Sequence, residues 1–191
     1  MFPSSGAFPV IPPVRGCCLT AKTVQTALAG TAGVGNFTQI VFDTVFYDTD
    51  NAADLANSQI KVPSWANWVM VQGHYSLPDQ NSASGQASIH LWRNVMPDGV
   101  HASITAAGLP YYPSPVSGNH STPEAHYHNR CNYLAAATPA ALQYQAMVAV
   151  TPLIPVLAVN EIWTLYGNQN TGTSQNTVAG TDCWLSVNFY Q

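Results

Sequence analysis

Two stretches between Thr38 and Tyr75 constrain the fold most, because their side chains alternate with a period of two. In residues 38–50, one face would carry Ile40, Phe42, Thr44 and Phe46, and the other Val41, Asp43, Val45 and Tyr47. In residues 60–77, Trp68, Met70 and Gln72 alternate with Val69, Val71 and Gly73. This parity is typical of β-strands, and Pro63, which lacks a backbone donor, belongs at a strand boundary or edge. The sequence therefore predicts two long strands joined by a loop.

Strand-like segments recur along the rest of the chain and are separated by turn residues. They cover residues 17–30, 86–94, 126–135, 142–150, 161–169 and 183–190, with short helical turns expected at 52–56 and 135–142. Eight to ten strands with this spacing indicate an all-β sandwich or barrel. A chain of 191 residues that is 47% hydrophobic suffices for one domain with its own core.

The composition excludes several classes of function. Only 7% of the residues are charged, the net charge is −4, and lysine and arginine together number five. Binding of nucleic acid or of an acidic membrane requires clustered cations, so we expect neither partner. No run of eighteen apolar residues predicts a transmembrane helix, and no basic segment before an apolar stretch predicts a signal peptide.

The first sixteen residues differ from the rest, because they contain four prolines and no alternating pattern. This segment contains large apolar side chains, among them Phe2, Phe8, Val10 and Ile11. A purely solvated tail has no need of such anchors. We interpret residues 1–16 as an extended arm that docks on a neighbouring subunit or a larger particle, and residues 17–191 as the folded domain. The alternative is an unattached terminus.

Two blocks of the sequence resemble the C1q/TNF-like jelly-roll family. In IVFDTVFYDTDNAADLANSQIKVPSWANWVMVQ, an acidic turn is followed by Pro63, Ala66 and Trp68, where the family usually has proline, glycine and tyrosine. The block LAVNEIWTLYGNQNTGTSQNTVAGTDCWLSVNFYQ resembles the family's last two strands, with Asn160 in place of its usual aspartate. The resemblance covers most of residues 17–191 and implies a jelly-roll β-sandwich that forms homotrimers.

Together with the low charge and the apolar arm, the resemblance suggests a virion protein of a tailed bacteriophage, assembled in the host cytoplasm. We expect a non-enzymatic head spike, head fibre or capsid decoration, docked on other virion proteins through residues 1–16. Three alternatives remain open: a tail-fibre or tail-tip receptor-binding protein, a secreted C1q/TNF-like ligand, and a jelly-roll enzyme that acts on carbohydrate.

The sequence contains no motif of a known catalytic site. A nucleophile elbow, a phosphate loop, an HExxH motif and an EF-hand loop are all absent. Glu124 and Glu161 are the only glutamates, and no second carboxylate is placed to form the pair that glycoside hydrolysis requires. We therefore expect no enzymatic activity and no organic cofactor.

Two histidines form a candidate metal site. His126 and His128 are two residues apart, so on a strand they project from one face. If that face lay on a threefold axis, six imidazoles would converge and could bind iron, nickel or zinc. The alternative is a pair of surface histidines hydrogen-bonded to the long loop 94–125. Asp48, Asp50 and Asn51 form an acidic turn that is compatible with calcium or with ordinary turn chemistry.

Aromatic residues are numerous, with five tryptophans and nine tyrosines. The loop 94–125 contains five prolines and presents Tyr111 and Tyr112 between two of them, so a surface platform is expected there. We propose contact with host surface glycans through Tyr111, Tyr112, Tyr127 and His120. The side chains of Trp68, Trp163 and Trp184 are expected to pack in the core or against neighbouring subunits.

The four cysteines, Cys17, Cys18, Cys131 and Cys183, lack the spacing of a zinc site. Cys17 and Cys18 would point to opposite faces of a strand. We expect buried free thiols, and a Cys131–Cys183 disulfide remains the alternative.

Overall fold

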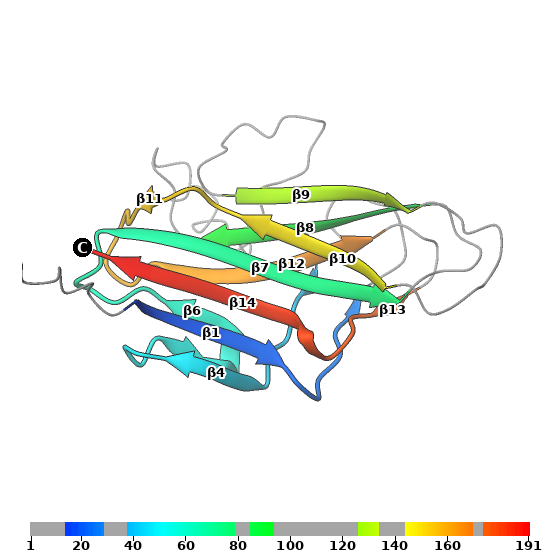
Figure 1. Cartoon of the computed structure of the whole chain (residues 1–191), viewed down its shortest axis with the longest axis horizontal. Helices are drawn as coiled ribbons and strands as arrows, with labels where there is room; N and C mark the ends of the chain where they lie inside the picture. The colour runs from blue at the N-terminus through cyan, green and yellow to red at the C-terminus, as the bar shows by residue number, and fades with distance from the viewer. Residues whose placement is uncertain (1–13, 29–37, 79–84, 94–125, 134–143, 170–173) are drawn as a thin grey trace, which may run out of the picture.

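The computed structural model describes residues 14–28, 38–78, 85–93, 126–133, 144–169 and 174–191. These residues form fourteen strands and one short 3-10 helix, η1 (Leu55–Asn57), and the main strands form two layers (Figure 1). Eight of the described strands have five or more residues, in agreement with the predicted all-β sandwich. In this part of the chain no helix has the length and apolar character required to cross a membrane.

The first layer is here called the β7 sheet. Its main strands lie in the order β10 (Tyr144–Val150), β7 (Trp68–Pro78), β14 (Gly180–Tyr190), β1 (Arg15–Ala21) and β4 (Thr44–Asp48), and β11 (Ile154–Pro155) also pairs with β7. All pairings are antiparallel. Strand β14 is therefore held on both sides, as expected for a final strand inserted in the sheet. Strand β1 begins at Arg15, two residues before the predicted start of the domain.

The second layer is here called the β12 sheet. Its order is β5 (Ala53–Asp54), β6 (Gln59–Lys61), β12 (Ile162–Gln169), β8 (Gly85–Arg93) and β9 (His126–Tyr133), and β3 (Thr38–Gln39) also pairs with β12. A separate two-stranded ribbon joins β13 (Gln175–Asn176) to β2 (Ala27–Leu28). The segment 17–30 thus contributes strands to two different sheets, because β1 pairs with β14 and β4 whereas β2 pairs with β13.

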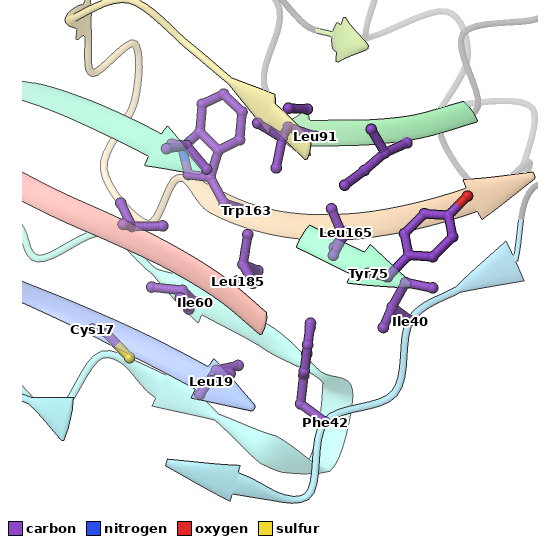
Figure 2. Close-up of a cluster of buried hydrophobic side chains, with 14 of the residues drawn as sticks. Cys17, Leu19, Ile40, Phe42, Ile60, Tyr75, Leu91, Trp163, Leu165 and Leu185 are labelled. Carbon is purple, nitrogen blue, oxygen red and sulfur yellow. The ribbon is translucent and has the colours of Figure 1, made fainter. Parts of the chain in front are cut away.

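The core lies between the two sheets (Figure 2). Its largest fully buried side chains include Trp163, Tyr75, Phe42, Leu19, Ile40, Leu91 and Leu165. At Gly73 the two sheets are close together, and an added Cβ would lie 2.5 Å from Leu165 Cδ1 and 2.8 Å from Leu91 Cδ2. Any larger residue there would force the side chains of these two leucines to shift in the packed core.

The prediction of one long strand over residues 38–50 is wrong. The segment contributes β3 to the β12 sheet and β4 to the β7 sheet, and it crosses the core between them. The amide of Ile40 donates to the Leu165 carbonyl (2.8 Å), whereas the amide of Asp43 donates to the Thr20 carbonyl (3.1 Å) in the other sheet. Phe46, which was expected on the same face as Ile40, is 71% exposed.

Asp43 fixes the position of this crossing. Its carboxylate accepts hydrogen bonds from the backbone amides of Lys22, Thr23 and Val24, at 2.7–3.0 Å. The Thr23 hydroxyl also donates to this carboxylate and is the largest single cause of its lowered pKa. Together with the amide bonds it holds the pKa of Asp43 well below its usual range. A period-two pattern contains no signal for such a change of sheet, because alternation is a property of each strand and does not report which sheet the strand joins.

Other predicted strands are confirmed. Pro63 lies in the connection between β6 and β7, and Val69, Val71 and Gly73 face the core while Trp68 and Met70 face outward. Residues 126–133 form β9, and η1 overlaps the predicted helical turn at 52–56. The arm residues Phe2, Phe8, Val10 and Ile11, the loop 94–125 and the turn at 135–142 lie outside the described residues.

The cysteines behave as buried hydrophobes where their side chains are described. Cys17, Cys18 and Cys183 are free and buried, so Cys183 does not form the alternative disulfide with Cys131. Cys17 faces the core opposite Val187, and Cys18 faces outward, as predicted. Burial raises the pKa of Cys18 to about 11 and that of Cys183 to about 12, so both thiols are neutral and unreactive at neutral pH.

Candidate functional site

The outer face of the β7 sheet is the candidate site, because it combines aromatic rings with almost no charge. Among the described residues, this face is defined by Trp68, Met70, Gln72, His74, Ala146, Val148, Val150, Trp184, Ser186, Asn188, Tyr190, Gly16, Cys18, Thr20 and Tyr47. Not one of these fifteen residues is lysine, arginine, aspartate or glutamate. Asp182, the third residue of β14 and two residues before Trp184, is the nearest carboxylate along that strand.

Strand register arranges these side chains in rows across the sheet. One row runs from Val148 through His74 and Trp184 to Thr20. The next row places Val150 and Gln72 beside Ser186, Cys18 and Tyr47. Because directly opposed residues in antiparallel strands lie side by side, the five strands present one continuous surface.

Polar contacts hold the middle of this face rigid. The Tyr47 hydroxyl lies 3.0 Å from the Ser186 Oγ, and His74 Nδ1 lies 2.9 Å from the Asp182 carbonyl oxygen. The His74 ring stacks on Trp184 with 5.9 Å between ring centroids and 14° between planes. Burial raises the pKa of Tyr47 despite its contact with Ser186, so its phenol stays neutral. The face is therefore preformed.

Apolar side chains at the margins of the face remain open to solvent. Val148 is 41% exposed, Val150 52%, Trp68 42% and Tyr190 39%. In β10 the structure turns Val148 and Val150 outward, while Met147 occupies the core. A strand that is apolar on both faces is the sequence signal for burial on both sides. Exposed apolar surface of this kind marks an interaction site.

The three tryptophans singled out from the sequence separate into two groups. Trp163 is fully buried in the core, as expected. Trp68 and Trp184 lie on the outer face of the β7 sheet, where they are available to a neighbouring molecule. Tryptophan is enriched at protein interfaces because it provides a large apolar area together with one hydrogen-bond donor.

The acidic turn next to this face is occupied by its own contacts. The Asp48 carboxylate accepts hydrogen bonds from the amides of Asp50, Ala52 and Ala53 at 2.9–3.1 Å. Asp50 pairs with the Arg15 guanidinium, and Trp65 Nε1 donates to it at 3.2 Å. Burial alone would raise the pKa of Asp50, but the hydrogen bonds that it accepts outweigh this and lower it. Turn chemistry is therefore sufficient to account for these carboxylates, and the calcium site stays an untested alternative.

A buried ion pair lies at one end of the sandwich. Glu161 is fully buried, and its oxygens accept hydrogen bonds from Trp163 Nε1 (2.8 Å) and the Leu157 amide (2.9 Å). The Arg93 guanidinium lies 3.9 Å from Glu161 and donates to the Pro155 carbonyl at 3.3 Å. Burial raises the pKa of Glu161, and the partners only partly offset this. Within the described part of the chain this carboxylate has no exposed surface, and its contacts are those of a structural ion pair.

The remaining predicted site residues are placed only in part. His126 and His128 lie in β9, opposite Trp92 and His90, so their predicted strand is confirmed and their metal site remains a prediction. Tyr127 lies opposite Leu91 in the same register. His120, Tyr111 and Tyr112 lie outside the described residues. No group of three or more potential metal ligands occurs among the described residues.

His74 and His90 both lie within strands and have polar contacts. His74 has the contact with Asp182 given above, and His90 Nε2 lies 2.7 Å from the hydroxyl of Ser88. Neither ring is therefore needed as a ligand to explain its position.

Comparison with known proteins yields one kind of similarity. No protein-family model matches the sequence, and no curated protein matches it either. Among solved structures, the chain is similar to Eiger TNF from S. frugiperda, with a TM-score of 0.50 and 6% identity over 94% of each chain. At this identity the likeness is one of fold alone. The chain has the C1q/TNF-like jelly-roll fold that the sequence blocks had suggested.

Proposed function

We propose that this chain is a non-enzymatic structural protein that assembles as a homotrimer through the outer face of the β7 sheet. The observation that carries the proposal is the exposure of Trp68, Tyr190, Val148 and Val150 on a sheet face without charged side chains. Covering these side chains would remove apolar area from water at about 25 cal/mol per Å².

A second copy of the chain suits this face better than a charged partner. The face has apolar margins and a row of uncharged polar groups at Gln72, Ser186 and Asn188. Interfaces between identical subunits are more apolar than transient ones and poor in charge at their centre. The C1q/TNF-like resemblance implies threefold assembly, in which one edge of each sandwich packs on the aromatic face of the next.

The wider proposal is that this trimer belongs to a bacteriophage virion, as a head spike, head fibre or capsid decoration. The support is the 7% content of charged residues and the apolar anchors within residues 1–16, both read from the sequence. Those anchors would dock on other virion proteins, and the opposite end would meet bacterial surface polysaccharide. The trimer can be correct even if this location is wrong.

Sedimentation equilibrium of the full chain tests the trimer. We expect a mass three times that of the chain, and a dilution-dependent fall in mass for Val150→Asp, because a buried unpaired charge is strongly unfavourable. Val159→Asp is the matched control, since Val159 is 73% exposed and lies between β11 and β12, outside the face. A wild-type monomer, or equal effects of the two variants, would contradict the proposal.

Deletion of residues 1–13 tests the docking role separately and leaves β1 whole, because that strand begins at Arg15. We expect the deleted protein to remain a folded trimer and to be absent from purified particles. A deleted protein that still enters particles would show that docking uses another surface.

A further inference from the structure

A groove lies on the outer face of the β12 sheet, on the layer opposite the proposed trimer interface. It forms where two short strands meet end to end along one edge of β12. Thr164 pairs with Gln59 of β6, and Tyr166 pairs with Gln39 of β3. Between these pairs the Ile40 amide donates to the Leu165 carbonyl (2.8 Å), so the junction is closed at its base.

The groove has a volume of about 440 Å³, which is within the range of small-molecule sites. Its lining is Gln39, Val41, Leu55, Ala56, Asn57, Ser58, Gln59, Thr164 and Tyr166. The β12 sheet and its short neighbours provide the floor, and η1 provides one wall. Not one of these nine residues is charged, so the lining offers neither a cation for an anionic ligand nor a carboxylate for a metal ion.

The three amide side chains in the lining have their amino groups engaged within the protein. Gln39 Nε2 donates to the backbone carbonyls of Asn57 (2.7 Å) and Ser58 (3.3 Å). Asn57 Nδ2 donates to both oxygens of Asp54, at 3.1 and 3.0 Å, and Gln59 Nε2 donates to Asp54 Oδ2 at 2.8 Å. The amide oxygens accept no hydrogen bond within the described part of the chain, so the groove presents acceptors.

Asp54 keeps two of these amides, those of Asn57 and Gln59, in one orientation. Hydrogen bonds from Asn57, Lys61 and Gln59 hold the pKa of Asp54 below its usual range, so the carboxylate is charged at neutral pH. Its side chain also pairs with Lys61 Nζ at 2.9 Å. A fixed set of acceptors favours a ligand that brings several hydrogen-bond donors, such as hydroxyls.

An aromatic ring completes the groove. Tyr166 is half-buried, and its ring packs against Trp92 with 4.9 Å between centroids and 40° between planes. Trp92 is itself almost fully buried and lies beside Tyr166 on the same face of the sheet, so it holds the Tyr166 ring in place. The supported ring offers a flat apolar surface beside the acceptors, and this combination fits a molecule with one C–H face and several hydroxyls.

We propose that this groove binds a neutral saccharide, whose hydroxyls donate to the oxygens of Gln39, Asn57 and Gln59 and whose C–H face lies on Tyr166. The site is separate from the glycan contact predicted at Tyr111, Tyr112, Tyr127 and His120. It lies within one protomer and does not depend on the trimer. In a trimer, three such grooves would strengthen attachment to a polymeric glycan through avidity.

Titration of the isotope-labelled full chain with methyl glycosides of glucose, galactose, mannose and N-acetylglucosamine tests the site by NMR. We expect saturable shifts in the amides of Gln59, Thr164 and Tyr166 with at least one glycoside, and none with glucuronate at the same concentration. Gln59→Met should weaken the affinity about tenfold by removing one acceptor. Gln25→Met, at an exposed site between β1 and β2, is the matched control and should change nothing.

Each other outcome overturns the inference. Absence of saturable shifts with any glycoside, equal binding of glucuronate, or shifts confined to residues away from the groove would exclude this site. Equal affinity of Gln59→Met and the wild type would exclude the proposed acceptors. The trimer is measured by mass in a separate experiment, so failure of one proposal leaves the other intact.

Discussion

The two outer faces of this sandwich differ in what they offer to a partner. The outer face of the β7 sheet consists of long strands, with exposed apolar side chains such as Trp68 and Val150 and no charge. The outer face of the β12 sheet is interrupted where β3 and β6 meet, and its groove is lined by amides whose donors are already used. The first face is suited to a second copy of the protein, and the second to a hydroxylated ligand.

The difference shows that strand continuity decides what a sheet face can bind. Long uninterrupted strands give a flat surface, which buries a large area only against another protein surface. A junction between short strands leaves a hollow that backbone pairing does not fill, and a small ligand fits there. One sandwich can therefore separate assembly and ligand binding on its two faces.

The largest expected effect comes from Glu161→Ala, which should lower the stability of the fold and so affect both sheets together. Arg93 belongs to the β12 sheet and donates to Pro155, which pairs with β7, so this cluster joins the two layers. Removing the carboxylate leaves the buried guanidinium unpaired and should lower the free energy of unfolding by about 3–5 kcal/mol.

Urea unfolding measures this loss. The double variant Glu161→Met/Arg93→Met is the control, because replacing both members of a buried ion pair by apolar residues is often neutral. We expect it to recover most of the stability. A Glu161→Ala protein as stable as the wild type would show that the pair does not join the layers.

Trp68→Ala should distinguish the two faces, because it should weaken the trimer whereas a substitution in the groove should not. A tryptophan at a subunit interface contributes about 2 kcal/mol or more, which corresponds to roughly a thirtyfold rise in the dissociation constant of the trimer. Leu55→Ala, in the wall of the groove, should leave that constant unchanged. Sedimentation at several concentrations measures both, and equal effects of the two variants would contradict the assignment of the interface.

The two faces should also respond to opposite extremes of pH. On the β7 sheet, the pKa of Cys18 is raised from 9.0 to about 11, so the unfolded chain loses this proton first as the pH rises. Stability is thus fully present below pH 9.0 and declines between there and about 11, by on the order of 1 kcal/mol from this group. Tyr47, whose pKa is also raised, acts in the same direction.

At the groove, the lowered pKa of Asp54 has the opposite consequence. Its contribution is present above the ordinary value of 3.8 and is lost as the pH falls below it. Urea midpoints measured across the pH range for the wild type, Cys18→Ala and Asp54→Asn would show the alkaline and the acidic loss of stability separately. An alkaline decline that Cys18→Ala leaves unchanged would remove Cys18 from the explanation.

The smallest expected effect is that of Lys61→Met at the rim of the groove. The Lys61 side chain is 55% exposed, and its ion pair with Asp54 is one of several contacts to that carboxylate. We expect a change in unfolding free energy below about 0.5 kcal/mol and unaltered saccharide binding. A larger loss of binding would show that the ion pair, rather than the amide bonds, orients the groove.

Much of the fold could be predicted from the period-two pattern. The strands at 68–78, 85–93, 126–133 and 180–190 lie where alternation placed them, and Pro63 lies at a boundary. The split of residues 38–50 into β3 and β4 could not be predicted, because the crossing depends on Asp43 meeting the amides of residues 22–24, which are distant in sequence.

The candidate interface was predictable in part and the groove was not. Trp68 and Trp184 were expected to pack in the core or against neighbouring subunits, but the sequence did not show that Val148 and Val150 would face outward. The groove depends on Gln39, Gln59 and Thr164, which come from three separate strands. None of these residues belongs to a motif, so only their assembly reveals them.

By itself the sequence determined that this chain forms strands, which side-chain parity each strand has, and that charge plays little part on its surface. Only the tertiary structure decided which parity faces the core, where the chain changes sheets, and where two short strands leave a hollow. The physical reason is that alternation is a local property of each strand. The inward face of each strand, the change of sheet and the groove all depend on hydrogen bonds and packing between segments that are far apart in the chain.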